Sequence, residues 1–172
     1  MADVDESPAP AAARPPRPRR RAVAVALVVL VALSSWLGWR DVQIRRAEDV
    51  RAQVLHAARV GMVALTSIDH DRVDDAVQRI LDTSTGGFRD DFALRAEPFK
   101  DAARKAQSTS VGTLTEAAVE SVDAEQGRVL VALTVMTSNR GAPEKQPKAW
   151  RTRVTVTKDG GRFKVAAVEF VP

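Results

Sequence analysis

The stretch Trp150–Val171, WRTRVTVTKDGGRFKVAAVEFV, decides the fold class of this 172-residue chain. Residues 150–158 alternate between two faces of an extended strand, and the face predicted to be buried carries Trp150, Thr152, Val154 and Val156. Such alternation is typical of a strand with one face on a core and one face in water. The following Asp-Gly-Gly, residues 159–161, predicts a tight turn, so residues 163–171 return antiparallel to the first strand.

Two further strands are predicted upstream of this hairpin. Residues 128–138 form the most strand-like run of the chain, and its centre is apolar on both faces. Residues 111–122 are rich in Thr and Val and alternate less regularly, and residues 123–127 form a turn between the two runs. The stretch 139–148 contains two Pro residues and is predicted to be a polar loop. The sequence therefore predicts four antiparallel strands joined mostly by short turns.

Helical periodicity dominates the residues before these strands. Residues 71–81 predict a helix of about three turns. Residues 88–107 resume the helical period, with Pro98 either kinking the helix or beginning a new one. Between the two helices, Gly86 or Gly87 is predicted to end the first helix in a left-handed conformation. The predicted class is therefore α+β, with helices on one face of a curved four-stranded antiparallel meander.

The first 39 residues divide into a polar tail and an apolar segment. Residues 1–21 contain five of the nine Pro residues and five Arg, and we expect a disordered cytoplasmic tail. Residues 22–39 carry no charge, and as a helix they would extend about 27 Å, close to the thickness of a bilayer core. Trp36 and Trp39 lie at the far end, where interfacial aromatic residues belong. A single transmembrane helix in contact with the bilayer is therefore predicted.

The charges beside this segment predict its orientation. Four basic residues precede it closely: Arg17, Arg19, Arg20 and Arg21. By the positive-inside rule they keep the N-terminus in the cytoplasm and place the C-terminal domain outside the cell membrane. A cleaved signal peptide is the alternative, because Ala32 and Ser34 are small residues of the kind that a signal peptidase reads. The apolar run continues past that site to Trp39, which favours an uncleaved anchor.

Residues 40–66 are predicted to continue as a juxtamembrane helix. An apolar stripe recurs along it at spacings of three and four residues: Ala47, Val50, Val54, Ala58, Gly61 and Leu65. We expect the second half of the stripe to pack on the chain's own globular domain, residues 67–172. The first half, comprising Ala47, Val50 and Val54, is the candidate contact surface for a partner subunit.

Composition limits the chemistry that this chain can perform. The formal net charge is +4, but residues after 21 hold 21 basic and 19 acidic residues, without a basic cluster beside aromatic residues, so a nucleic-acid partner is not expected. The absence of Cys excludes disulfides and thiolate metal sites. His56 and His70 are isolated from each other, and Asp69 and Asp71 beside His70 indicate a helix N-cap rather than a metal site. No catalytic residue, cofactor or metal is predicted.

Residues 76–92, centred on TGGFRDDF at 85–92, and the run DGGRFKV at 159–165 resemble the Mce-associated membrane proteins of actinobacteria. The resemblance extends over residues 20–172 and rests mainly on architecture: an Arg-rich tail, one anchor, a long helix and a four-strand meander. It implies a nuclear transport factor 2-like cone, a fold that is also found in assembly proteins of type IV secretion.

The resemblance also implies a function. We expect a non-enzymatic, membrane-anchored accessory or scaffold subunit of the cell envelope that assembles or stabilises an Mce-type lipid import complex, with the subunits of that complex as partners. No catalytic residue carries over, because the family has no recognised catalytic motif. Ketosteroid isomerases of the cone fold use a Tyr, and this chain has none. The alternative is a cone domain that binds a small apolar ligand or lipid, with or without catalysis.

Overall fold

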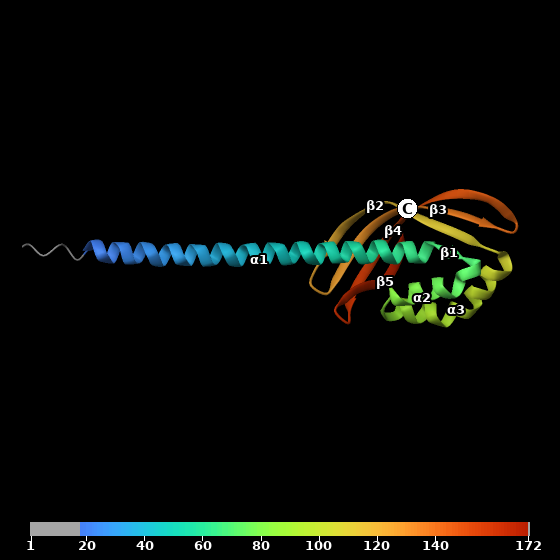
Figure 1. The fold of residues 1–172 in the computed structure, drawn as a ribbon, viewed down its shortest axis with the longest axis horizontal. Coiled ribbons are helices and arrows are strands. Elements are labelled where there is room, and N and C mark those ends of the chain that lie inside the picture. Colours follow the sequence, from blue (N-terminus) through green and yellow to red (C-terminus); the bar gives the residue numbers. More distant parts are fainter. Residues whose placement is uncertain (1–17, 172) are drawn as a thin grey trace, which may run out of the picture. The chain divides into compact units, whose positions relative to one another are not determined.

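The computed structural model describes residues 18–171, so residues 1–17 of the predicted tail, with Arg17, lie outside them, whereas residues 18–21 belong to the first helix (Figure 1). The elements in chain order are α1 (Pro18–Thr66), β1 (Ile68–Asp69), η1 (His70–Arg72), α2 (Val73–Asp82), α3 (Gly86–Ala106), β2 (Thr109–Val122), β3 (Gln126–Asn139), β4 (Ala142–Asp159) and β5 (Arg162–Phe170). The predicted order of helices followed by strands is confirmed for every strand except β1, which lies between α1 and α2. A compact unit, here called the C-terminal domain, begins at Arg45, so it includes the second half of α1.

The described strands form one antiparallel sheet in the order β1-β2-β3-β4-β5. The sequence predicted four strands, and the fifth is β1, in which Ile68 pairs with Ser110 and Asp69 with Thr109. Two residues are too few to show an alternating pattern, so only the fold reveals this strand. Register shifts in the β2–β3, β3–β4 and β4–β5 pairings bend the sheet, as β-bulges do.

Strand β4 has the predicted faces but begins earlier than predicted. Thr152, Val154 and Val156 are buried as expected. The predicted loop at 139–148 is wrong: a turn at Arg140 and Gly141 closes the β3–β4 hairpin, and β4 already pairs with β3 from Ala142 onward. Strand β5 pairs with β4 only from Thr152, so the earlier part of β4 has one unpaired edge. Pro is tolerated there because a free edge needs no N–H donor.

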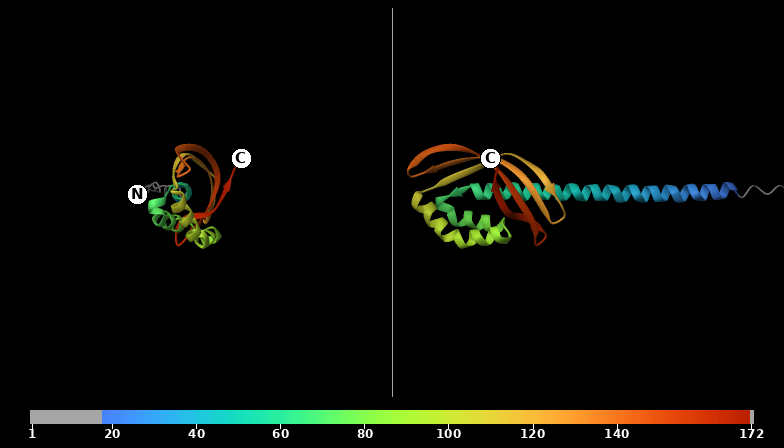
Figure 2. Two further views of the ribbon diagram at one scale, coloured as in Figure 1. Left: turned by 90° about the vertical axis from the view of Figure 1, so that its right-hand side faces the viewer. Right: turned by 180° about the vertical axis from the view of Figure 1, so that it is seen from behind.

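The second half of α1 fills the concave side of the sheet, and the strands curve around it (Figure 2). Its buried residues Val54, Ala58 and Met62 pack against the inward-facing side chains of the strands. Those strand residues are Ala117, Val129, Val131, Leu133, Val135, Val154, Val156, Phe163 and Val165. This burial is the main hydrophobic stabilisation of the domain.

Helices α2 and α3 form a second layer against the end of α1. A smaller core joins Ala64 of α1 and Ile68 of β1 to α2 and to Ala103 of α3. On the surface, Asp74 of α2 forms ion pairs with two residues of α3. Its Oδ1 atom lies 3.2 Å from Lys100 Nζ, and its other carboxylate oxygen pairs with Arg104. Pro98 lies inside α3, which continues through it, so the alternative of a new helix at this position does not apply.

Gly86 adopts the predicted left-handed conformation, with φ of +59°, but at a different place in the fold. Helix α2 ends at Asp82 with Thr83 as its C-cap, and Gly86 is the first residue of α3. The intervening residues are held by β5: the Thr85 amide donates to the Val165 carbonyl at 2.8 Å, and the Val165 amide donates to the Thr83 carbonyl at 2.9 Å. The pairing with β5 therefore separates the helix end from the glycine.

Gly86→Val is expected to destabilise the domain by about 1 to 2 kcal/mol, because a β-branched residue is strained at positive φ. Gly87→Val is the matched control, since Gly87 lies outside the left-handed region and neither glycine has a heavy atom within 4 Å of an added Cβ. Thermal unfolding of the two variants in detergent, followed by circular dichroism, measures the difference. Equal melting temperatures for both variants would show that the backbone conformation at Gly86 carries no strain.

Candidate functional site

The first half of α1 has the properties predicted for a membrane anchor. Within the described residues it is the helix that is long and apolar enough to cross a membrane. Trp36 and Trp39 are 52% and 64% exposed, and the Arg40 guanidinium lies 5.6 Å from the centroid of a Trp36 ring, a cation–π distance. The Ser34 hydroxyl donates to the Leu30 carbonyl at 2.8 Å, which satisfies a polar group inside the apolar run.

The four Arg residues predicted to orient the anchor lie at the margin of the described structure. Arg17 is outside it. The backbone of Arg19, Arg20 and Arg21 belongs to α1, and their side chains lie outside the described part. Their role in orientation stays a prediction.

The predicted partner stripe divides into exposed and buried parts. Ala47 is exposed, Val50 is partly buried against the main core, and Val54 is fully buried in it. The prediction that Val54 contacts a partner is therefore wrong. A Cβ atom added to Gly127 would lie 2.4 Å from Cγ1 of Val54, so β3 already covers the Val54 side chain. The helical period that marks a partner-facing stripe is the same one that marks a core-facing stripe, and here the fold uses Val54 for the core.

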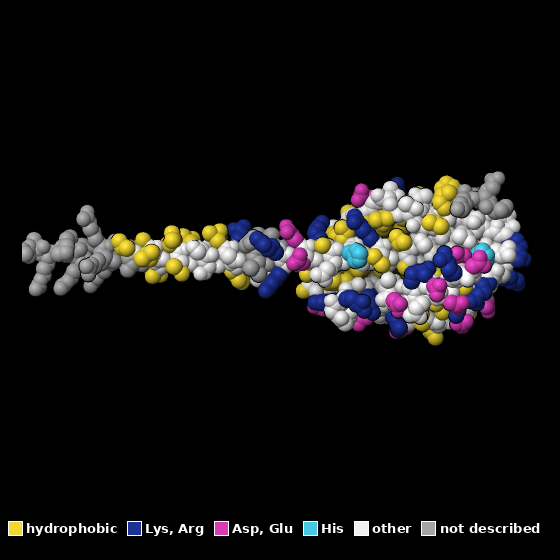
Figure 3. Space-filling model, viewed as in Figure 1, with side chains coloured by type: hydrophobic (Ala, Val, Ile, Leu, Met, Phe, Trp, Pro, Cys, Tyr) yellow, Lys and Arg dark blue, Asp and Glu magenta, His cyan; other side chains and the backbone are white. Residues whose placement is uncertain are grey.

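A different face of α1 is open and apolar. Between α1 and the end of α2 runs a groove of about 460 Å³, here called the α1–α2 groove. It is lined by Arg59, Val60, Val63, Ala64, Ser67, Arg79, Asp82 and Thr83. Val60 and Val63 remain 42% and 40% exposed. Figure 3 shows hydrophobic side chains beside Lys and Arg on the face of the domain on which Figure 1 shows α1 and α2.

The rim of the α1–α2 groove carries positive charge. Arg59 and Arg79 form no ion pair with any described residue. The carboxylate of Asp82, the acid in the lining, accepts a hydrogen bond from the side-chain amide of Gln78 at 2.8 Å. An apolar floor between two unpaired guanidinium groups fits a partner that presents apolar side chains flanked by carboxylates.

A second concavity lies between the sheet, the end of α1 and helix α3. This sheet hollow has a volume of about 400 Å³ and is bounded by the end of α1, by β1, by α3 and by strands β2 to β4. It is lined by Leu65, Thr66, Ile68, Phe99, Ala102, Ala103, Ala106, Ser108, Ser110, Val135, Thr137 and Trp150. Eight of these are apolar and four carry hydroxyl groups, and none of these twelve described residues is charged.

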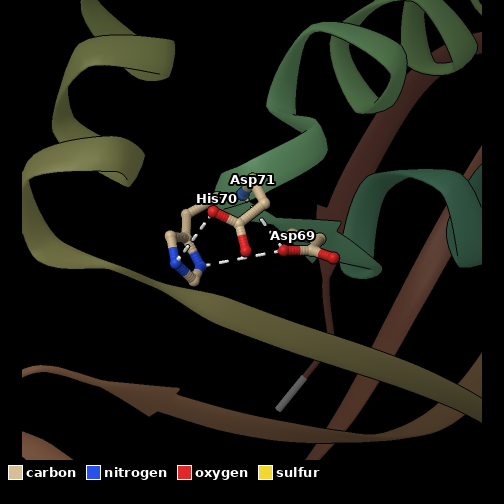
Figure 4. A group of neighbouring side chains, drawn as sticks. All are labelled: Asp69, His70 and Asp71. Atoms are coloured by element: carbon tan, nitrogen blue, oxygen red, sulfur yellow. Dashed lines mark hydrogen bonds and ion pairs between the residues drawn. The ribbon is translucent and has the colours of Figure 1, made fainter.

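The cluster around His70 acts as the predicted cap (Figure 4). Asp69 is the N-cap of η1, and its carboxylate accepts a hydrogen bond from the Asp71 amide at 3.1 Å. That bond lowers the pKa of Asp69 below its usual value. His70 Nδ1 lies 3.2 Å from Thr109 Oγ1, which ties the cap to β2. The three side chains could offer ligand atoms within 4.8 Å of one another, but exposed acidic groups often do so without an ion.

With these surfaces in place, comparison with known proteins gives the family. The sequence profile of the family described as "Uncharacterized protein Rv1363c/MT1408-like" matches residues 19–172. The chain belongs to this family. The match covers the apolar half of α1 as well as the C-terminal domain.

Two Mycobacterium tuberculosis proteins are similar to this Rv1363c/MT1408-like chain. Uncharacterized protein Rv1363c of strain H37Rv is 36% identical over 140 residues, which are 81% of this chain and 54% of the relative, so the chain spans about half the length of that protein. Outer membrane protein Rv1973 of the same strain is 29% identical over 135 residues, which are 77% of this chain and 83% of the relative.

Solved structures share the fold of this Rv1363c/MT1408-like chain. An IcmL-like type IV secretion system protein from Legionella pneumophila superposes with a TM-score of 0.56 at 17% identity, over 71% of this chain and 92% of the other. The periplasmic domain of DotI superposes with a TM-score of 0.52 at 16% identity, over 69% of this chain and 93% of the DotI domain. The predicted fold class, α+β with helices packed on a curved antiparallel sheet, is confirmed, with five strands in place of the four predicted.

The sequence pattern of this Rv1363c/MT1408-like chain predicted neither concavity. Val60 and Val63 lie three residues apart, off the main apolar stripe, and this spacing was the available signal for a second apolar face of α1. The sheet hollow had no such signal. Ser110 and Thr137 are 27 positions apart, and only the β2–β3 register brings them opposite each other.

Proposed function

We propose that this chain is a single-pass accessory subunit, without catalysis of its own, that assembles or stabilises an Mce-type lipid import complex. Its N-terminus lies in the cytoplasm, and its C-terminal domain lies on the outer side of the cell membrane. The apolar first half of α1 supports the anchor, and the Arg residues before it support the orientation.

The α1–α2 groove is the observation that carries this proposal. Val60 and Val63 present apolar surface to solvent in a domain that buries its other large aliphatic α1 side chains from Val54 onward wholly or partly. Burial of this apolar floor under a partner would stabilise the complex by the hydrophobic effect. Arg59 and Arg79 would favour a partner whose carboxylates lie opposite the two guanidinium groups.

The chemistry of the sheet hollow supports a role without catalysis. The described part of its lining has hydroxyl groups but no carboxylate, imidazole or amine that could activate them as nucleophiles. The fold is compatible with an envelope role. One similar structure is an IcmL-like protein of a type IV secretion system, and the other is the periplasmic domain of DotI. Because one fold serves many functions, this likeness adds to the proposal and does not carry it.

Site-specific photo-crosslinking in native membranes tests the proposal. A photoreactive amino acid at Val63, in the α1–α2 groove, should give adducts with subunits of one membrane transport complex, identified by mass spectrometry. The same amino acid at Leu94 of α3, which is 82% exposed, is the matched control and should not give these adducts. If the position-63 protein stays free of adducts in membranes that contain the complex, the groove is not a subunit contact.

A further inference from the structure

We propose that the sheet hollow binds an uncharged, largely apolar molecule with an ester, carbonyl or hydroxyl oxygen at one end, the chemistry of a monoacylglycerol. This site is separate from the α1–α2 groove, and no element of the assembly role requires it. Its volume of about 400 Å³ lies within the usual range for small-ligand sites, roughly 300–1,000 Å³.

Small side chains on α3 keep the hollow open. Ala102, Ala103 and Ala106 face it from a helix whose neighbouring aromatic residue, Phe99, forms part of the wall. On the opposite side, Trp150 is held by Phe170, with ring centroids 5.3 Å apart in an edge-to-face arrangement. The alanines leave space that a larger residue would fill, and the aromatic residues give an apolar ligand rigid surfaces to contact.

Hydroxyl groups gather at one side of the hollow. Ser110 and Thr137 are direct partners in the β2–β3 register, so their side chains are neighbours on the same face of the sheet. The Ser110 hydroxyl accepts from the Ile68 amide at 3.3 Å, which leaves its own proton to donate. The Thr66 hydroxyl, in contrast, already donates to the Met62 carbonyl at 2.6 Å. The hollow can therefore donate hydrogen bonds to a ligand oxygen from its β2–β3 side.

The charge of the lining selects against ions. No lining residue whose side chain the structure describes can neutralise a carboxylate, a phosphate or an ammonium group, and an unpaired charge in an apolar site is costly. A fatty acid would have to leave its carboxylate outside or bind in its protonated form. An ester or alcohol of the same chain length meets no such penalty, so the hollow should prefer the neutral molecule.

The test uses the full chain in phosphatidylcholine nanodiscs with a monoacylglycerol that carries a diazirine in its acyl chain. Photolabelling should be saturable and should map to α3 and to β3 or β4 around residues 99–106 and 135–150. Unlabelled monoacylglycerol should compete at least tenfold better than the fatty acid of equal length. Equal competition by the fatty acid would overturn the selection for a neutral ligand, and non-saturable labelling would overturn the site.

Variants locate the site independently of the competitor. Ala102→Trp and Ala106→Trp change exposed residues at the rim, and each should reduce labelling at least tenfold by filling the hollow. Ala118→Trp is the matched control on an exposed position of β2 outside the hollow, and it should label like the wild type. Undiminished labelling in both rim variants overturns the proposal. Crosslinking from Val63 in the same variants reports separately on the assembly role.

Discussion

Val54→Asp should unfold the C-terminal domain, whereas Ala47→Asp should leave it folded. Val54 is 0% exposed and packs in the main core, where Gly127 and the strand around it leave no space for water. A carboxylate there would be buried without a partner, and such substitutions cost more than about 4 kcal/mol. This is a large part of the roughly 5–15 kcal/mol that stabilises a typical domain. Limited proteolysis and circular dichroism of the full chain in detergent would measure the loss.

Two controls separate the charge from the loss of packing. Ala47 lies two helical turns before Val54 and is exposed, so an Asp at this position stays in water. Val54→Ala keeps the site apolar and should cost only about 2 kcal/mol, from two lost methyl groups and the resulting cavity. If Val54→Asp resists protease as well as Ala47→Asp does, the second half of α1 is not part of the core.

Replacing both Val60 and Val63 by Asp should detach the chain from its partner subunits without unfolding it. Both side chains are about two-fifths exposed, so the new carboxylates can remain hydrated in the free domain. In the bound state they would be buried against an apolar partner surface, and we expect at least a tenfold lower yield of co-purified subunits. The yield from native membranes in mild detergent is the measurement, and Leu94→Asp is the matched control.

Charge reversal tests the second property of the α1–α2 groove. Arg59→Glu together with Arg79→Glu keeps the apolar floor and changes only the rim. If the partner carries carboxylates there, this variant should bind more weakly, most clearly at low salt, where electrostatic contacts are least screened. Binding that is the same at all salt concentrations would show that the two guanidinium groups do not contact the partner.

The sequence predicted those parts of the fold that local pattern determines. The alternation at 150–158 gave the buried face of β4, and the Asp-Gly-Gly at 159–161 gave its hairpin with β5, in which Gly160 and Gly161 have positive φ. The class of the fold followed from the change of periodicity near residue 108. A left-handed conformation was expected at Gly86 or Gly87, and Gly86 adopts it, although at the start of α3 and not at the end of α2.

What the sequence could not predict depends on contacts between distant segments. The two-residue strand β1 exists because β2 pairs with it, and the extended link at Thr83–Thr85 exists because β5 pairs with it. The assignment of Val54 to a partner failed for the same reason: helical spacing identifies an apolar face but not what covers it. The α1–α2 groove and the sheet hollow are likewise products of packing between elements.

The most direct test of the assembly role is the steady-state level of Mce complex subunits in membranes of a strain that lacks this chain. Quantitative mass spectrometry should find those subunits depleted in the deletion strain and restored by the wild-type chain or by Leu94→Asp. The variant with Asp at both Val60 and Val63 should be present at normal abundance and yet fail to restore them. Subunit levels that stay normal in the deletion strain would contradict the assembly role.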